Sequence, residues 1–229
     1  MKKISALLLS AVLSAGAQAA TASYTDSFYN ALQKTDFLNQ SGSLDMFDSS
    51  LGTLTSVTLT LYGTSITDLE LSNNSSLTST ASATTRTRLS FSSSLAPLST
   101  LLGSTYKIQL EPSSPEVVLT PGETQSFYDI EESKSYTVNN VNSILSSFYG
   151  SAGSTFNIFC SSKTTLLTSV EGGNSEASQS TDAACGAEIS YTYTVAEVPP
   201  PAVPEPASLA LVGLGMIGVA ASRRKSRQA

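Results

Sequence analysis

Pairs of acidic side chains one to three residues apart are the groups in this sequence that could do chemistry. Hydrolysis of a glycosidic bond needs two carboxyl groups at a set separation, one of them acting as an acid. The candidates are Asp45 with Asp48, Asp68 with Glu70, and Asp129 with Glu131 and Glu132. On a strand, Asp68 and Glu70 share one face because side chains alternate with a period of two. Solvent-facing strand surfaces carry such pairs routinely, so the pairs favour a structural role.

Histidine is absent from the whole sequence of 229 residues. Without it the chain cannot form a Ser-His-Asp triad, a Cys-His pair or a histidine-ligated zinc site. This excludes most classes of secreted hydrolase. We therefore expect no enzyme activity and no cofactor, with a secreted glycosidase as the enzymatic alternative.

Three other sets of side chains could bind a ligand. Calcium takes oxygen ligands, but Asp45 and Asp48 alone do not make an EF-hand loop, so no metal site is expected and calcium stays an alternative. Arg86 and Arg88 would share a strand face and could receive an anionic sugar, although solvated arginine pairs are more ordinary. Aromatic platforms for a sugar ring are available at Tyr62, Tyr128, Tyr149, Tyr191 and Tyr193.

The first nineteen residues have the three parts of a secretory signal peptide. Lys2 and Lys3 form the charged region, residues 4–12 are apolar, and Ala17 and Ala19 form an A-x-A cleavage site. We expect cleavage after Ala19 and export of one domain, residues 20–197.

A second set of signals lies at the C-terminal end. Residues 198–206 form a proline-rich spacer that cannot join a helix or a central strand. Residues 207–222 would form a short transmembrane helix, whose apolar run of about fifteen residues spans about 22 Å, at the lower edge of what spans a bilayer. Residues 223–229 are predicted to be a basic cytoplasmic tail, with a stop-transfer signal at Arg223, Arg224, Lys225 and Arg227.

The end of the spacer reads Val203, Pro204, Glu205, Pro206. Together with the apolar helix, its glycines and the arginine cluster, it resembles the PEP-CTERM sorting signal of Gram-negative bacteria. The resemblance implies that a membrane peptidase of the exosortase type recognises the Pro-Glu-Pro segment and removes the helix. It also implies delivery to the cell surface or extracellular matrix, with exopolysaccharide as a further candidate partner. An ordinary single-span anchor that is never cut is the alternative.

The two cysteines of the exported part, Cys160 and Cys185, predict a disulfide, because export places them in an oxidising compartment. The bridge would close a loop of about 25 residues, worth roughly 3–4 kcal/mol on the chain-entropy model. We expect it to hold the glycine- and serine-rich segment 171–184, which has few other anchors. The alternative, a nucleophilic cysteine, lacks a histidine partner.

The exported part is strongly acidic. It holds six of the twelve basic residues and seventeen of the eighteen acidic ones, a net charge of about −11. This charge disfavours binding to nucleic acid or to an anionic membrane surface.

Alternation of apolar and polar residues with a period of two, together with frequent turn residues, predicts many short strands in the exported part. The pattern is clearest at residues 57–61 and 189–195, and Gly63 permits a turn or bulge after the first. Other strands are expected at residues 22–37, 66–71, 84–91, 105–110, 116–119, 124–130, 135–141, 154–160 and 165–170. Val141–Phe148 is the one expected helix, because its apolar residues recur at i, i+3, i+4 and i+7. The fold class predicted is mainly β: an antiparallel β-sandwich with Greek-key or jelly-roll connections and one short helix.

A second resemblance lies at the start of the first clear strand. The segment Phe-Asp-Ser-Ser-Leu-Gly-Thr-Leu at residues 47–54 resembles the opening of the choice-of-anchor E domains, which are exported β-rich proteins. The resemblance implies no catalytic activity and transfers no functional residue, and the cysteines depart from it. From the residues alone, Asp48 is expected to cap a turn. The function predicted is that of a non-catalytic surface or matrix protein, with a carbohydrate-binding or adhesive module as the alternative.

Overall fold

The computed structural model describes residues 20–195. Four predictions lie outside the described residues: the signal peptide at 1–19, the spacer at 198–206, the transmembrane helix at 207–222 and the basic tail at 223–229. Within the described part, neither helix has the length and apolar character that crossing a bilayer requires.

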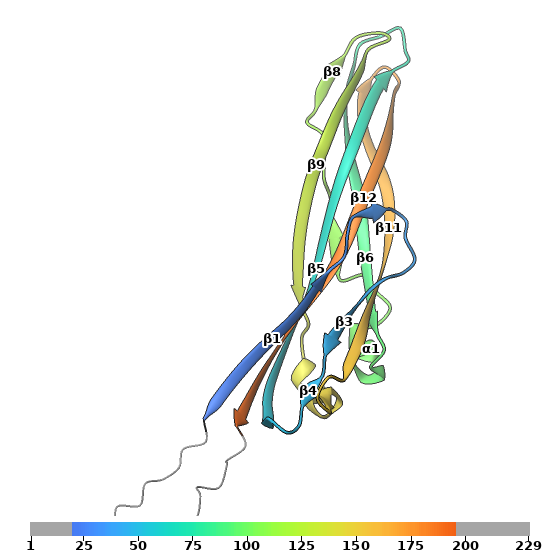
Figure 1. Cartoon of the computed structure of the whole chain (residues 1–229). Coiled ribbons are helices and arrows are strands. Elements are labelled where there is room, and N and C mark those ends of the chain that lie inside the picture. Colours follow the sequence, from blue (N-terminus) through green and yellow to red (C-terminus); the bar gives the residue numbers. More distant parts are fainter. Residues whose placement is uncertain (1–19, 196–229) are drawn as a thin grey trace, which may run out of the picture. The chain divides into compact units, whose positions relative to one another are not determined.

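Two antiparallel sheets pack face to face as a β-sandwich (Figure 1). The first sheet has the strand order β1-β12-β5-β9, with β2 paired to β12. Its strands are β1 Thr21–Tyr29, β2 Gln33–Lys34, β5 Gly52–Asn73, β9 Thr124–Thr137 and β12 Ser175–Val195. The second sheet has the order β3-β11-β6-β7, with β8 paired to β6. Its strands are β3 Gln40–Asp45, β6 Ser79–Ser93, β7 Ile108–Leu110, β8 Val117–Leu119 and β11 Thr155–Gly172.

The chain crosses repeatedly between the two sheets. Strands β1, β5, β9 and β12 lie in the first sheet, whereas β3, β6 and β11, which alternate with them in sequence, lie in the second. Two antiparallel sheets joined by such crossings form a β-sandwich. A short parallel pair, β4 Phe47–Asp48 with β10 Tyr149–Gly150, lies outside both sheets. The predicted mainly β, antiparallel sandwich is therefore confirmed.

We call the two ends of the sandwich the base and the tip. At the base β1 begins and β12 ends, and the N–H of Val195 donates to the carbonyl of Ala20 at 2.8 Å. At the tip the chain turns between β5 and β6, between β8 and β9, and between β11 and β12 (Figure 1). Both segments outside the described residues thus join the sandwich at its base.

The longest strands are longer than the sequence predicted. β5 is one strand of 22 residues, roughly 70 Å at about 3.3 Å per residue. No turn interrupts it at Gly63, where an added Cβ would lie 2.4 Å from Cδ1 of Leu89. A glycine is therefore required at this position because Leu89 packs closely against it, not because the chain turns there. Residues 154–160 and 165–170, predicted as two strands, likewise belong to the single strand β11.

Residues 20–195 contain two short helices, where the sequence predicted one for the exported domain. Val141–Phe148 is helical as predicted, but it is a 3₁₀ helix with a kink at Ile144. The helix α1 Ala96–Leu102 was missed, because only two of its residues, Leu98 and Leu102, form its buried stripe. A helix this short gives too brief a period to stand out among serines and threonines.

The interior of the sandwich is filled by two separate clusters. The larger lies toward the base and through the middle, and its largest fully buried side chains include Phe47, Phe148 and Tyr191. The smaller lies toward the tip and consists of Leu69, Leu71, Ala81, Ala83 and Leu119. Buried hydroxyls supplement the smaller cluster, since Oγ1 of Thr67 and Oγ1 of Thr181 are hydrogen-bonded at 3.0 Å.

Candidate functional site

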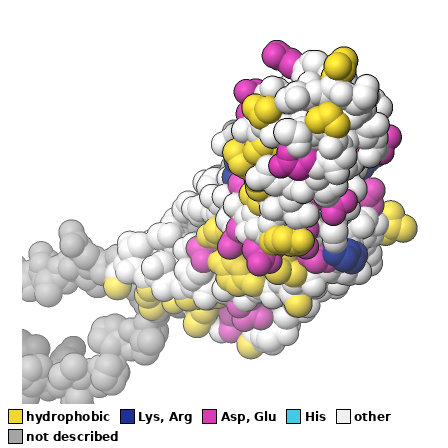
Figure 2. All heavy atoms as spheres, turned by 90° about the horizontal axis from the view of Figure 1, so that it is seen from above, with side chains coloured by type: hydrophobic (Ala, Val, Ile, Leu, Met, Phe, Trp, Pro, Cys, Tyr) yellow, Lys and Arg dark blue, Asp and Glu magenta, His cyan; other side chains and the backbone are white. Residues whose placement is uncertain are grey.

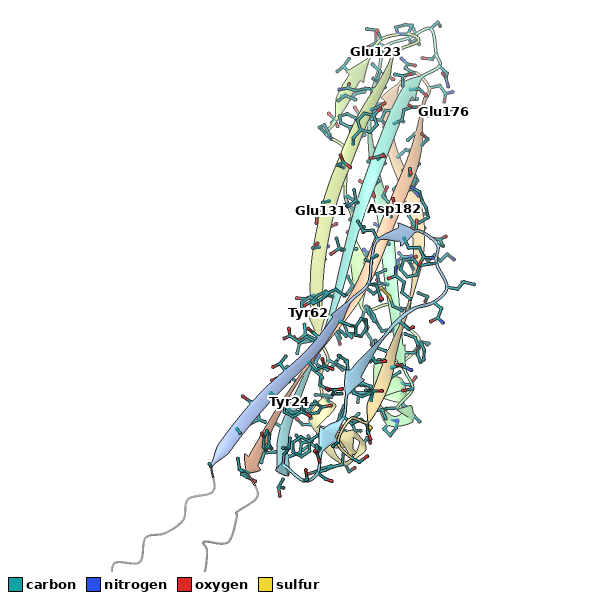
Figure 3. All side chains as sticks on the ribbon, in the orientation of Figure 1. Tyr24, Tyr62, Glu123, Glu131, Glu176 and Asp182 are labelled. Atoms are coloured by element: carbon teal, nitrogen blue, oxygen red, sulfur yellow. A yellow bond between two sulfur atoms is a disulfide. The ribbon has the colours of Figure 1, made fainter. Side chains whose placement is uncertain are left out.

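A row of residues crosses the outer face of the first sheet halfway along its length. The strand register places Tyr29 of β1 opposite Gly186 of β12, Gly186 opposite Tyr62 of β5, and Tyr62 opposite Ser135 of β9. Paired residues of neighbouring strands point to the same face, so these four share the outer surface. Figure 3 shows Tyr62 on this sheet, between Tyr24 near the base and the acidic residues near the tip.

Gly186 allows the two tyrosines of this row to meet. A Cβ at Gly186 would lie 2.6 Å from Cδ1 of Tyr29 and 2.9 Å from the carbonyl oxygen of Phe28. Without a side chain between them, the rings of Tyr29 and Tyr62 have centroids 5.3 Å apart and planes inclined by 46°. The Tyr29 side of the pair is open to solvent, with 63% of the residue exposed.

The tyrosine pair borders a groove with a volume of about 470 Å³. Residues of β1, β5, β9 and β12 form most of its lining, and Asn30 and Leu32 of the segment after β1 complete it. The lining residues are Tyr29, Asn30, Leu32, Tyr62, Gly63, Thr64, Ser133, Lys134, Ser135, Ala184, Cys185 and Gly186. We call this the tyrosine groove. Its volume lies in the range of small-molecule sites.

Hydroxyl and amide groups give the tyrosine groove its polarity. Oγ1 of Thr64 and Oγ of Ser133 are 2.8 Å apart on the floor, and each keeps further hydrogen-bonding capacity. The side-chain amide nitrogen of Asn30 is buried and has no hydrogen-bond partner among the described residues. It is an unsatisfied buried donor in a residue that lines the groove.

The charges around the tyrosine groove are balanced or kept outside it. Nζ of Lys134 lies 2.7 Å from Oε1 of Glu132 and donates to the carbonyl of Gln109 at 2.9 Å. Burial raises the pKa of Tyr62, and the nearby carboxylate of Glu188 raises it further. The phenol of Tyr62 therefore stays protonated at neutral pH and can donate a hydrogen bond. No carboxylate is among the described residues that line the groove.

Of the five tyrosines that the sequence suggested as platforms, only Tyr62 lines this groove. Tyr191 is fully buried and its hydroxyl donates to the carbonyl of Asp45 at 2.7 Å. Tyr193 packs against the core, Tyr149 accepts a hydrogen bond from the N–H of Leu54 at 2.9 Å, and Tyr128 stands exposed on β9. These four tyrosines therefore do not form a common binding surface.

Tyr29, the other half of the aromatic pair, was missed by sequence reasoning. It ends the alternating segment of β1, and nothing in its local pattern distinguishes it from a solvated residue. The only available signal was the glycine of Cys-Gly-Ala at residues 185–187, a small residue within an otherwise regular strand.

At least one member of each carboxylate pair takes part in a local structural contact. Asp48 caps a turn as expected: the N–H of Ser50 donates to its Oδ1 at 2.8 Å, and the hydrogen bonds from Ser50 lower the pKa of Asp48. Oδ1 of Asp68 accepts a hydrogen bond at 3.0 Å from the N–H of Asp129, which has a positive φ of 53° beside the β5–β9 register shift. Glu132 accepts a hydrogen bond from the N–H of Glu111 and pairs with Lys134.

The arginines proposed for an anionic sugar already have partners. Nε of Arg86 lies 2.7 Å from Oε1 of Glu111, which together with other neighbours lowers the pKa of that carboxyl group. Arg88 donates to Oε1 of Gln109 at 3.1 Å and lies over the ring of Tyr106. Within residues 20–195, no group of three or more acidic or cysteine side chains is placed to hold a metal ion.

The predicted disulfide between Cys160 and Cys185 is confirmed, with a Cα–Cα distance of 6.5 Å. It joins β11 of the second sheet to β12 of the first, inside the larger core. The prediction that it holds an otherwise weak segment 171–184 was wrong. Most of that segment belongs to β12 and is hydrogen-bonded to β5 along its length. The bridge instead fixes the spacing of the two sheets beneath the tyrosine groove.

Comparison with known families identifies the tail. Residues 202–225 match the model of the PEP-CTERM protein-sorting motif, and this span includes Pro204, Glu205, Pro206 and the first arginines of the basic cluster. The motif supports an exported protein that is sorted at the membrane by an exosortase. No curated protein matches this chain.

Several solved structures are similar to the chain at low identity. The structure of Desmodium yellow mottle tymovirus is 10% identical, with 86% of this chain and 99% of that one covered and a TM-score of 0.23. Infectious bursal disease virus Gx strain is 11% identical, with 77% and 37% covered and a TM-score of 0.22. The VP2 subviral particle of infectious bursal disease virus is 12% identical, with 77% and 38% covered and a TM-score of 0.21. At these TM-scores the similarity supports no conclusion about function or assembly.

Proposed function

We propose that this chain is an exported, non-catalytic protein of the cell surface or extracellular matrix, delivered through its PEP-CTERM motif. The match at residues 202–225 carries this proposal. An exosortase-type membrane peptidase recognises Val203–Pro206 and removes the apolar segment and basic tail beyond it, which releases the sandwich from a membrane-anchored precursor. The sandwich supports the proposal, because its first and last described residues meet at the base, where Val195 is hydrogen-bonded to Ala20.

Processing is tested by the intact mass of the mature protein from its native host. We expect loss of residues 1–19 and of everything after the proline segment. Replacing Pro204 and Pro206 by alanine should leave a longer protein in the membrane fraction, whereas the matched variant Pro199→Ala with Pro200→Ala should be processed normally. Retention of the complete tail in the native protein would contradict processing and leave a plain anchor.

A second role, binding of a matrix glycan, is favoured by the tyrosine groove. An aromatic pair beside a floor of hydroxyls offers both surfaces that a sugar needs, an apolar face for its C–H groups and partners for its hydroxyls. The described residues carry six basic and sixteen acidic side chains, which disfavours an anionic polymer. Figure 2, which looks onto the tip, shows acidic side chains over that surface and few basic ones. We therefore infer a neutral glycan.

Glycan binding is tested by applying the mature protein to an array of neutral and acidic oligosaccharides. Tyr62→Ala and Tyr29→Ala should each weaken binding at least tenfold, and Tyr128→Ala, which removes another exposed tyrosine, should not change it. Equal binding by all three variants would show that the ligand binds outside the tyrosine groove. Binding to no glycan would support a purely structural role at the surface. Release of sugar from the ligand would contradict the non-catalytic role.

A further inference from the structure

One strand of the second sheet has a long edge without a partner. β3 pairs with β11 only over Thr155–Cys160, whereas β6 pairs with the other side of β11 as far as Gly172. The loop before β3 continues along that edge, since the N–H of Ser162 donates to the carbonyl of Phe37 at 3.0 Å and that of Thr164 to Oδ1 of Asp36 at 2.6 Å. Beyond Thr164 the described residues provide no partner, so residues 165–171 form an open edge near the tip.

The orientation of the backbone along this open edge follows from the last bonds before it. The N–H groups of Ser162 and Thr164 point away from β6, and strand alternation therefore points those of Leu166, Thr168 and Val170 the same way. Three N–H groups and the three carbonyls of the same residues are thus available for another strand. An unpaired edge of this kind is a template for strand addition.

The side chains along the open edge lack the usual protection. The segment reads Thr-Leu-Leu-Thr-Ser-Val-Glu, with strong β formers, no proline and no charge before its last residue. Val170 and Thr168 lie on the core-facing side and yet are exposed, Val170 by 37%. By contrast the other long edge strand of the tip, β9, carries Asp129, Glu131, Glu132 and Lys134.

We propose that the open edge binds the same edge of a second copy of this chain, antiparallel, in a two-fold symmetric pair. The backbone orientation requires even-numbered residues to face even-numbered residues, so the two-fold axis passes midway between two copies of the same residue. The register is centred on Thr168, the middle of residues 165–171. It pairs Leu166 with Val170 of the second copy, and Thr168 with Thr168 of the second copy. About six main-chain hydrogen bonds form, and the half-buried Leu166 of each copy covers the exposed Val170 of the other.

Charge complementarity supports a second copy as the partner. Lys163 and Glu171 are exposed, lie on the outer face of β11, and take part in no ion pair among the described residues. In the register centred on Thr168, Lys163 lies diagonally across from Glu171 of the second copy, a distance that long side chains can bridge. The two-fold symmetry generates this contact between Lys163 and Glu171 twice, once at each end of the paired strands.

The geometry determines where such a pair can form. Because the two β11 strands run in opposite directions, the two tips overlap and the two bases point apart. Each base is where the tail joins. The pair therefore links copies held on two facing surfaces, or copies released into the matrix. The pairing follows from the strand edge alone, and only this placement rests on the proposed export.

Cysteine cross-linking of the full chain in its host tests the proposal. Directly opposed residues of a hydrogen-bonded pair have Cα atoms about 5.5 Å apart, which a disulfide can join. Thr168→Cys should therefore give a dimer that a reducing agent separates. Leu167 faces residue 169 of the second copy and lies two positions from its own equivalent, so Leu167→Cys should give at least fivefold less dimer. Two differently tagged populations, grown apart and then mixed, should yield dimers that carry both tags.

A proline variant separates pairing from folding. Val170→Pro removes an N–H that faces the open edge and keeps the bonds to β6, so it should abolish the Thr168→Cys dimer and leave the thermal midpoint nearly unchanged. Lys163→Glu should reduce the dimer, and adding Glu171→Lys should restore it. Equal dimer from Thr168→Cys and Leu167→Cys, no dimer in an exported and folded protein, or cross-linking to a different protein would each overturn the proposal.

Discussion

The base and the tip of the sandwich use the same long strands but are filled in different ways. At the base, aromatic rings pack together: the ring of Phe47 has centroid distances of 5.2 Å to Tyr193 and 5.4 Å to Tyr149. At the tip, the buried side chains are leucines, alanines and hydroxyls. Large side chains bury more apolar area and stabilise more. The difference indicates a stable base and a tip whose stability depends more on hydrogen bonds between buried polar side chains.

The largest expected effect is at the base. Phe47→Ala should lower the free energy of unfolding by about 3–5 kcal/mol, because it empties the centre of the aromatic cluster. The matched substitution at the tip, Leu71→Ala, should cost about 2–3 kcal/mol, since fewer neighbours surround it. Denaturant unfolding of both variants measures the two values. A cost for Leu71→Ala equal to that for Phe47→Ala would contradict the difference between the two ends.

The disulfide lies between the two regions and should contribute slightly less than the base aromatics. Replacing Cys160 and Cys185 together by alanine should destabilise the protein by about 3–4 kcal/mol, the cost of releasing a loop with a sequence separation of 25. The same loss should follow reduction of the native protein, and the double variant should not respond to reductant. A variant as stable as the parent would show that the sheets keep their spacing without the bridge.

At the tip, the buried hydroxyl pair should contribute a smaller amount. Thr67→Val should cost about 1–2 kcal/mol by removing one partner of the hydrogen bond to Thr181. Thr181→Val should cost a similar amount, and the double variant should cost less than the sum of the two, because both act on one bond. Amide hydrogen exchange should become faster in the strands near the tip, where the stability is lost. Strict additivity would mean that the bond does not contribute.

The stability of the base should also depend on alkaline pH. Burial, with the nearby Asp45 carboxylate, raises the pKa of Tyr24 from 10.0 to about 12, and burial raises the pKa of Tyr191 as well. A phenol whose folded pKa is raised stabilises fully below pH 10, and this contribution is lost as pH rises from about 10 to 12. The thermal midpoint should fall in that window, and less steeply in Tyr24→Phe. Equal slopes in the two proteins would contradict this assignment.

The sequence predicted the strands well where apolar residues alternate, as at Val57, Leu59 and Leu61, because alternation reflects which face is buried. It failed where the cause lies in another strand. Gly63 favours a turn on local grounds, but the side chain of Leu89 in the second sheet is what requires a glycine there. The tyrosine groove was missed for the same reason: Tyr29 and Tyr62 are 33 positions apart, and only the register through Gly186 brings them together.

The amino-acid sequence by itself determined the sorting motif, the absence of histidine chemistry, the disulfide and the β class of the fold, because each depends on residue types and short spacings. The tertiary structure alone decided which tyrosines meet, where the disulfide lies and which strand edge stays open. These depend on register and on crossings between sheets, in which residues far apart in the chain become neighbours. The local sequence pattern does not show which distant residues become neighbours in the folded protein.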